Sequence, residues 1–80
     1  MSRLPHLSGS ELIKYLQKFG FEVARQRGSH IVLKRKNKDD SETGTVVPNH
    51  KELATGTFLG ILKQCGITPD EFMDKYADWV

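Results

Sequence analysis

The chain has 80 residues, of which 38% are hydrophobic and 28% charged, as in an ordinary soluble globular protein. We expect one small domain over residues 1–80, because this length leaves no room for a second core or a deep internal pocket. The single cysteine excludes an intrachain disulfide and a cysteine-based zinc site. No apolar run approaches the length of a signal core or a membrane span, so we expect a cytoplasmic protein without a membrane contact.

The net charge of +2 combines two segments of opposite sign. Residues 1–38 contain nine Lys and Arg against two Asp and Glu, a net charge of +7, whereas residues 39–80 have a net charge of −5. Such a separation indicates either a basic surface for an anionic partner or a solvated exterior without a ligand. Charge alone favours neither interpretation.

The first predicted element is a helix over residues 9–19. Ser8 and Glu11 have the spacing of a capping box, in which each side chain accepts a hydrogen bond from the other residue's backbone N–H. Apolar residues then recur at helical spacing, namely Leu12, Ile13, Leu16 and Phe19. Gly20 is a typical residue for the end of a helix.

Three strands are predicted after this helix. Residues 21–26 alternate in character, and a glycine turn at 27–29 leads into a second strand over 30–36. The polar segment 37–44 is expected to be a mobile hairpin loop. A short third strand over 45–47 ends at a proline, which cannot donate to a ladder. Short links between successive strands favour an antiparallel meander.

Two more helices complete the order α-β-β-β-α-α, which is an α+β fold. One is predicted from about Thr55 or Thr57 to Cys65, where the cysteine is interpreted as a core residue. Gly60 inside it costs about 1 kcal/mol relative to alanine, so we expect it to pack closely on a neighbouring element. The last helix begins at a second capping box in residues 68–71. Its apolar side is interpreted as core or partner surface and comprises Phe72, Met73, Tyr76 and Trp79.

The candidate functional residue is a histidine at the start of the second predicted strand. Alternation along a strand places Ile31 and Leu33 on one face and His30 on the other, together with Lys34. If the apolar pair packs under the helices, His30 points to the open face of the sheet. A histidine side chain can both accept and donate a proton near neutral pH. This position therefore suits acid–base chemistry.

Basic residues near this histidine are interpreted either as a solvated edge or as ligands of phosphate groups. The favoured phosphate ligands are Arg27, Lys34 and Lys36, from a wider set that also includes Arg25 and Arg35. Arg35 shares the face of the apolar residues, so its guanidinium would have to extend out of the core layer. Ser29 either caps the turn or binds a phosphate. Gly28 is interpreted as a structural turn residue.

Two further histidines are given weaker interpretations. His50 follows a strand end and is a possible auxiliary acid or base, although a structural role in the turn is slightly favoured. His6 is expected to be a solvated residue. The three histidines lack the spacing of a metal site, so we expect no metal and no cofactor.

Several segments together resemble the HicA toxin family. They are Arg27-Gly28-Ser29-His30, Val47-Pro48-Asn49-His50, Lys51-Glu52-Leu53, Gly56-Thr57 and Ile61-Leu62-Lys63-Gln64-Cys65-Gly66-Ile67. The triplet Gly-Ser-His is common by itself, and the order and spacing of the segments make the resemblance specific. It covers nearly the whole chain, although the loop 37–44 looks long for the family and segment 69–80 has an aromatic character of its own.

This resemblance implies both a fold and an activity. The implied fold is like the double-stranded-RNA-binding domain, with helices packed on one face of a three-stranded antiparallel sheet. The implied protein is the toxin of a type II toxin–antitoxin system, an mRNA interferase whose catalytic residue is His30. As a metal-independent endoribonuclease it would use the RNA 2′-hydroxyl as nucleophile. The implied partner is a HicB-like antitoxin that binds the toxin and covers this histidine.

Two alternative functions fit the same residues. A non-catalytic RNA-binding module of the same fold would hold duplex RNA through phosphates and 2′-hydroxyls. A small protein-interaction domain would need only an exposed strand edge and the aromatic segment. Salt-dependent affinity for RNA distinguishes the first two functions from the third, and cleavage distinguishes the toxin from the binding module.

Overall fold

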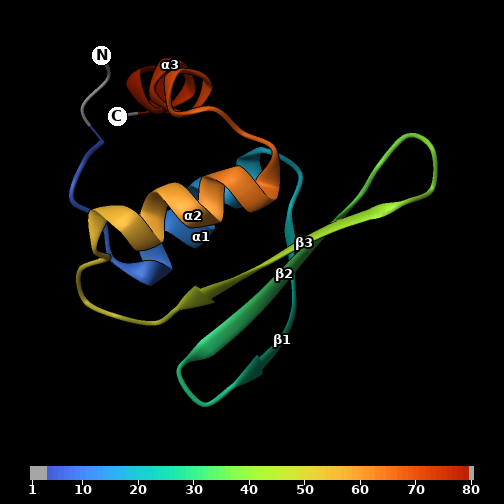
Figure 1. Ribbon diagram of the computed structural model, residues 1–80, viewed down its shortest axis with the longest axis horizontal. Helices are drawn as coiled ribbons and strands as arrows, with labels where there is room; N and C mark the ends of the chain where they lie inside the picture. The colour runs from blue at the N-terminus through green and yellow to red at the C-terminus, as the bar shows by residue number, and fades with distance from the viewer. Residues whose placement is uncertain (1–3, 80) are drawn as a thin grey trace.

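A computed structural model describes residues 4–79 of the chain. Its elements are α1 (Gly9–Lys18), β1 (Glu22–Arg27), β2 (His30–Lys36), β3 (Glu42–Pro48), α2 (Thr55–Cys65) and α3 (Pro69–Trp79). The sheet order is β1-β2-β3 with both pairs antiparallel, and Figure 1 shows the helices on one side of it. This arrangement confirms the predicted α+β fold, which is like the double-stranded-RNA-binding domain. No helix within residues 4–79 has both the length and the apolar character needed to cross a membrane.

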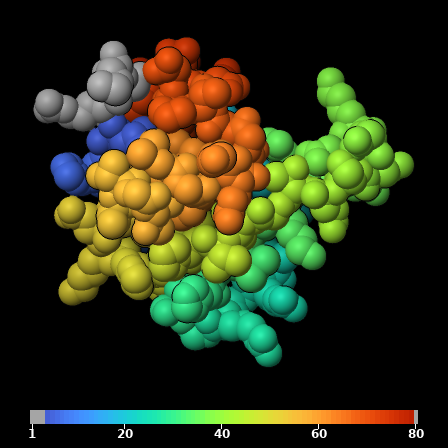
Figure 2. Space-filling model, in the orientation of Figure 1, coloured from blue at the N-terminus to red at the C-terminus, as the bar shows by residue number. Residues whose placement is uncertain are grey.

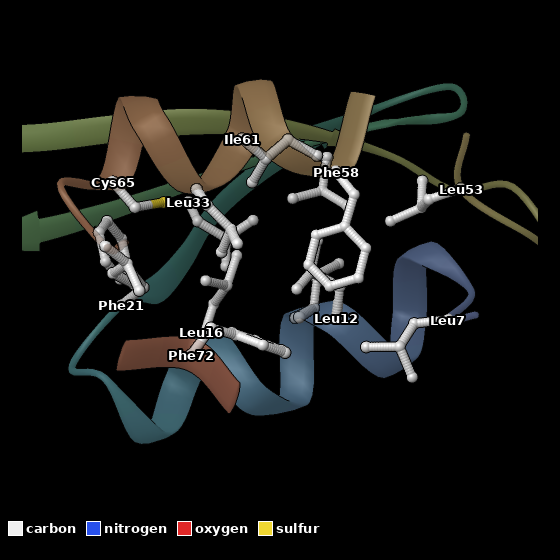
Figure 3. Close-up of a cluster of buried hydrophobic side chains, with 14 of the residues drawn as sticks. Leu7, Leu12, Leu16, Phe21, Leu33, Leu53, Phe58, Ile61, Cys65 and Phe72 are labelled. Carbon is white, nitrogen blue, oxygen red and sulfur yellow. The ribbon is translucent and has the colours of Figure 1, made fainter. Parts of the chain in front are cut away.

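One hydrophobic core lies between the sheet and the helices. Figure 3 shows side chains from α1, β2, α2 and α3 converging there, among them Leu16, Leu33, Phe58 and Phe72. β3 contributes the fully buried Val47. α3 packs its aromatic residues against α1 and α2, with Phe72 in edge-to-face contact with both Tyr15 and Phe58. The aromatic residue Phe72 is therefore part of the core.

Both predicted capping boxes are present. In α1 the Ser8 Oγ accepts from the Glu11 N–H at 3.1 Å, and the Glu11 carboxylate accepts from the Ser8 N–H at 2.9 Å. In α3 Thr68 and Glu71 make the same two bonds, each 3.0 Å long. These hydrogen bonds lower the pKa of both glutamates because they stabilise the ionised carboxylate. The helix starts were therefore predicted correctly, because their signals lie within four residues.

The hairpin between β2 and β3 is shorter than predicted. β3 begins at Glu42, so the loop comprises residues 37–41 and not 37–44. The Asn37 side chain donates to Ser41 Oγ at 3.0 Å and to Thr43 Oγ1 at 2.9 Å, and the Asn37 N–H donates to the Ser41 carbonyl at 2.8 Å. These polar side chains form hydrogen bonds with one another across the hairpin. The third strand can therefore begin at Glu42, earlier than predicted. Figure 2 shows the resulting arm protruding from the body of the molecule.

Arg35 faces the helices, as strand alternation predicts. Its guanidinium donates to the carbonyl oxygens of Phe19 at 3.3 Å and Cys65 at 3.5 Å, at the C-terminal ends of α1 and α2. The same group lies 4.6 Å from the centre of the Phe21 ring. A cation at two helix C-termini stabilises both of them. Arg35 therefore has a structural role and does not contribute to the open face.

The prediction that Gly60 packs closely on a neighbouring element is wrong. A Cβ atom at Gly60 would meet no atom within 4 Å, and the residue is exposed. The close contact occurs instead at Gly9, where a Cβ atom would overlap the carbonyl oxygen of Pro48 and lie 3.1 Å from Asn49 Cα. The N-terminus of α1 therefore packs directly on the backbone at the end of β3.

Candidate functional site

The β1–β2 hairpin positions His30 at the end of the sheet. Gly28 and Ser29 form the two-residue turn, and Gly28 has a φ of +57°, as expected at the first central position of a type II′ turn. Arg27 was predicted to belong to the turn, but it is the last residue of β1. The first pair of the ladder is Arg27 with His30, so these two side chains are direct cross-strand neighbours. Gly28 thus has the structural role predicted for it.

The register assigns side chains to the two faces of the sheet, because paired residues of an antiparallel sheet share a face. Ile31 and Leu33 are buried under the helices, so His30 lies on the open face and is exposed. Three cross-strand rows follow on that face, starting from the turn. They are Arg27–His30–Pro48, Arg25–Val32–Val46 and Glu22–Lys34–Gly44, and Lys36 pairs with Glu42 beyond them.

The strand that contains Arg25 and Arg27 is uncovered. All six residues of β1 are exposed, and a bulge interrupts its register between Val23 and Arg25. Backbone pairing with β2 therefore keeps β1 in the sheet, and none of the β1 side chains is buried. The bulge also protects this edge strand from pairing with another chain.

The end of β3 supports the turn from the other side. The Asn49 N–H donates to the Ser29 carbonyl at 2.6 Å, which ties the turn to the segment after β3. The His50 N–H donates to the Pro48 carbonyl, and the His50 carbonyl accepts from the Gly9 N–H, both at 2.9 Å. The His50 backbone is thus structural, as favoured from the sequence. Its side chain is exposed at the same end of the sheet as His30.

His6 is exposed but has a partner that was not predicted. Its Nδ1 lies 3.4 Å from Glu52 Oε2, a contact that becomes an ion pair when the imidazole is protonated. The neighbouring Leu7 carbonyl accepts from the Leu53 N–H at 2.8 Å. No local sequence signal indicates this pairing, because the two segments are more than forty residues apart.

The predicted phosphate ligands differ in their charged neighbours. Lys34 Nζ lies 3.9 Å from Glu42 Oε1, and Lys36 Nζ lies 3.7 Å from Asp40 Oδ1. Within residues 4–79, neither Arg27 nor Arg25 forms an ion pair with a carboxylate. Arg25 was placed only in the wider set of candidates from the sequence, but like Arg27, and unlike the two lysines, it has no carboxylate partner within residues 4–79.

Cys65 is a core residue, as interpreted from the sequence. It is fully buried, and this burial raises the pKa of its thiol to about 11. The thiol is therefore protonated at neutral pH and unsuited to act as a nucleophile. In the described part of the chain, His, Cys, Asp and Glu side chains do not gather in groups of three that could hold a metal ion.

Comparison with known families identifies the chain. A family model described as the HicA toxin of bacterial toxin–antitoxin systems matches residues 9–67, well over half of the chain. The chain belongs to the HicA toxin family. The match includes Arg27, His30 and His50, and it ends before α3. No curated protein and no solved structure matches the chain significantly.

As a HicA toxin, the protein is the toxic component of a toxin–antitoxin system. Two of the segments on which the family resemblance rests, residues 27–30 and 47–50, meet in space at the turn. Gly28 and Ser29 form it, Asn49 is hydrogen-bonded to it, and Pro48 pairs with His30. The arrangement offers an exposed imidazole beside a guanidinium that no carboxylate in residues 4–79 neutralises. This combination suits proton transfer at an anionic substrate.

Proposed function

We propose that this HicA toxin is a metal-independent endoribonuclease that cleaves mRNA in the cytoplasm and thereby blocks translation. The observation that supports the proposal most is the pairing of exposed His30 with Arg27 on the open face of the sheet. An open face accommodates a polymer that a closed pocket would exclude. Family membership independently supports a toxic activity.

The proposed reaction uses the RNA as its own nucleophile. The 2′-oxygen attacks the adjacent phosphorus while the bond from phosphorus to the 5′-oxygen breaks, which leaves a 2′,3′-cyclic phosphate and a 5′-hydroxyl. His30 removes the proton from the 2′-hydroxyl or donates one to the departing 5′-oxygen. Arg27 stabilises the negative charge that develops on the phosphorane.

Other residues have proposed supporting roles. His50 is the proposed auxiliary acid or base, because one imidazole cannot accept and donate a proton at the same moment. Ser29, Lys34 and Lys36 are proposed to bind RNA together with Arg27. All of these residues are exposed, so RNA can reach them without a change in the fold.

The activity is tested with purified toxin, a labelled single-stranded RNA and excess chelator. We expect fragments that end in a 2′,3′-cyclic phosphate and begin with a 5′-hydroxyl, and no cleavage where a 2′-deoxy nucleotide precedes the scissile bond. Salt-dependent binding without cleavage would favour the non-catalytic RNA-binding module instead. If the protein neither binds nor cleaves RNA, the protein-interaction domain is the function that remains.

We also propose that a HicB-like, acidic antitoxin covers His30. The exposed cationic end of the sheet would accelerate its association with an acidic partner. Diethyl pyrocarbonate modifies exposed histidines, and the site of modification can be mapped by mass spectrometry. We expect His30 to be modified in the free toxin and protected in the complex. Equal modification of His30 in a saturated complex would contradict this mode of inhibition.

A further inference from the structure

We infer that single-stranded RNA crosses the open face of the sheet along β1, with its phosphates mainly on Arg27 and Arg25, and that the lysines of β2 make only minor contacts with it. The inference rests on the proposed ribonuclease function. It adds Arg25 to the binding residues and gives the substrate a path.

The open face is divided into two halves of different charge. The arginine end comprises the first two cross-strand rows, with Arg25 and Arg27 and no carboxylate, for a net charge of +2. The lysine end comprises the rows beyond them and the adjoining loop. Its charged residues are Glu22, Lys34, Lys36, Lys38, Asp39, Asp40 and Glu42, for a net charge of −1. His30 belongs to the arginine end.

Carboxylates at the lysine end weaken its attraction for RNA. A phosphate that approaches Lys34 also approaches Glu42, 3.9 Å from the ammonium group, and Glu22 in the same row. The 3.9 Å between Lys34 and Glu42 is well inside the Debye length of about 8 Å at physiological ionic strength, so salt only weakly screens the repulsion between this carboxylate and the phosphate. At the arginine end, no carboxylate on the open face repels a phosphate.

The geometry of β1 favours one extended RNA backbone. Arg25 and Arg27 are two residues apart, a separation of roughly 7 Å along a strand. The row of Arg25 continues across β2 and β3 as an apolar pair, Val32 and Val46, of which Val46 is 44% exposed. This pair provides a surface for a nucleobase beside the two guanidinium groups.

The proposed chemistry requires the same class of substrate. The 2′-oxygen must lie in line with the departing 5′-oxygen, and the geometry of an A-form duplex holds it out of line. A single strand can rotate about its backbone to reach the in-line arrangement. We therefore assign single-stranded RNA to the arginine end.

The test measures how the affinity for RNA depends on salt. The probe is a single-stranded oligonucleotide with 2′-O-methyl riboses, which lack the free 2′-hydroxyl that the proposed cleavage requires. Arg25→Ala and Arg27→Ala should each reduce the slope of log K against log salt by about 0.7, the value for one phosphate contact on a single strand. Lys34→Ala and Lys36→Ala remove the same charge and should reduce it by less than half as much.

Two further variants make the comparison sharper. Lys75→Ala in α3 removes one positive charge outside the sheet and should leave the slope unchanged, which controls for net charge. Glu42→Gln removes the partner of Lys34 and should steepen the slope and tighten binding. Circular dichroism verifies that each variant is folded.

Each alternative outcome is distinguishable. Slope losses at the lysines that equal or exceed those at the arginines would overturn the proposed path while leaving the ribonuclease function intact. Arginine variants that bind RNA normally but bind the antitoxin weakly would make β1 a protein-binding strand. If the wild-type toxin neither binds the oligonucleotide nor cleaves RNA, the inference and the proposed function both fail.

Discussion

Replacing His30 with alanine is expected to slow RNA cleavage by about 10²–10⁴-fold, the usual contribution of a positioned acid or base. The loss corresponds to about 3–5 kcal/mol of activation free energy. RNA binding should be largely retained, because Arg27 and the other proposed ligands remain. The rate is measured on labelled RNA in chelator, and binding is measured with the 2′-O-methyl oligonucleotide.

The same variant also tests the placement of His30 on the open face. An exposed residue at a strand start contributes little to stability, so the free energy of unfolding should change by less than about 0.5 kcal/mol. His50→Ala is the matched control, since it removes another exposed imidazole from the same end of the sheet, and we expect a smaller loss of activity. A folded His30→Ala protein with the wild-type rate would refute the catalytic assignment, whereas an unfolded one would refute its exposed position.

Replacing Gly9 with alanine is expected to destabilise the protein by at least about 1–3 kcal/mol, the usual effect of inserting a methyl group into a packed site. The added Cβ would overlap the Pro48 carbonyl oxygen, which is backbone and cannot rotate away. This overlap can be relieved only if α1 moves away from residues 48–50. Since Asn49 is hydrogen-bonded to Ser29, we also expect this movement to disturb the turn beside His30 and to reduce cleavage.

The matched control is Gly60→Ala, the same substitution in α2. No atom would lie within 4 Å of the new Cβ, and alanine favours a helix over glycine by about 1 kcal/mol. We therefore expect this variant to be more stable than the wild type by about that amount. Urea unfolding of both variants measures the difference, and equal effects at the two positions would contradict the packing described for Gly9.

The elements of the fold were predictable because their signals are local. Capping boxes at Ser8 and Thr68 connect residues three apart, and the alternation that placed His30 opposite Ile31 requires only neighbouring residues. The candidate catalytic position could therefore be derived from the sequence together with the family resemblance. Errors of one to three residues occurred at strand ends, at the turn and at the end of α1.

The charged surroundings of the site were not predictable, because they depend on the register between distant residues. The net charge of +7 in residues 1–38 favoured Lys34 and Lys36 as RNA ligands. It did not show that β3 returns Glu42 to the same end of the sheet, since this depends on the hairpin being shorter than predicted. Likewise, composition could not distinguish the tightly packed Gly9 from the exposed Gly60.

The lack of buried side chains in β1 has a consequence for the evolution of this toxin. Substitutions at exposed positions usually change stability little, so the six residues of β1 can vary without weakening the core. The core depends instead on β2, β3 and the helices. On the proposed RNA path, mutations in β1 that change the preferred substrate would thus need no compensating stabilisation elsewhere in the fold.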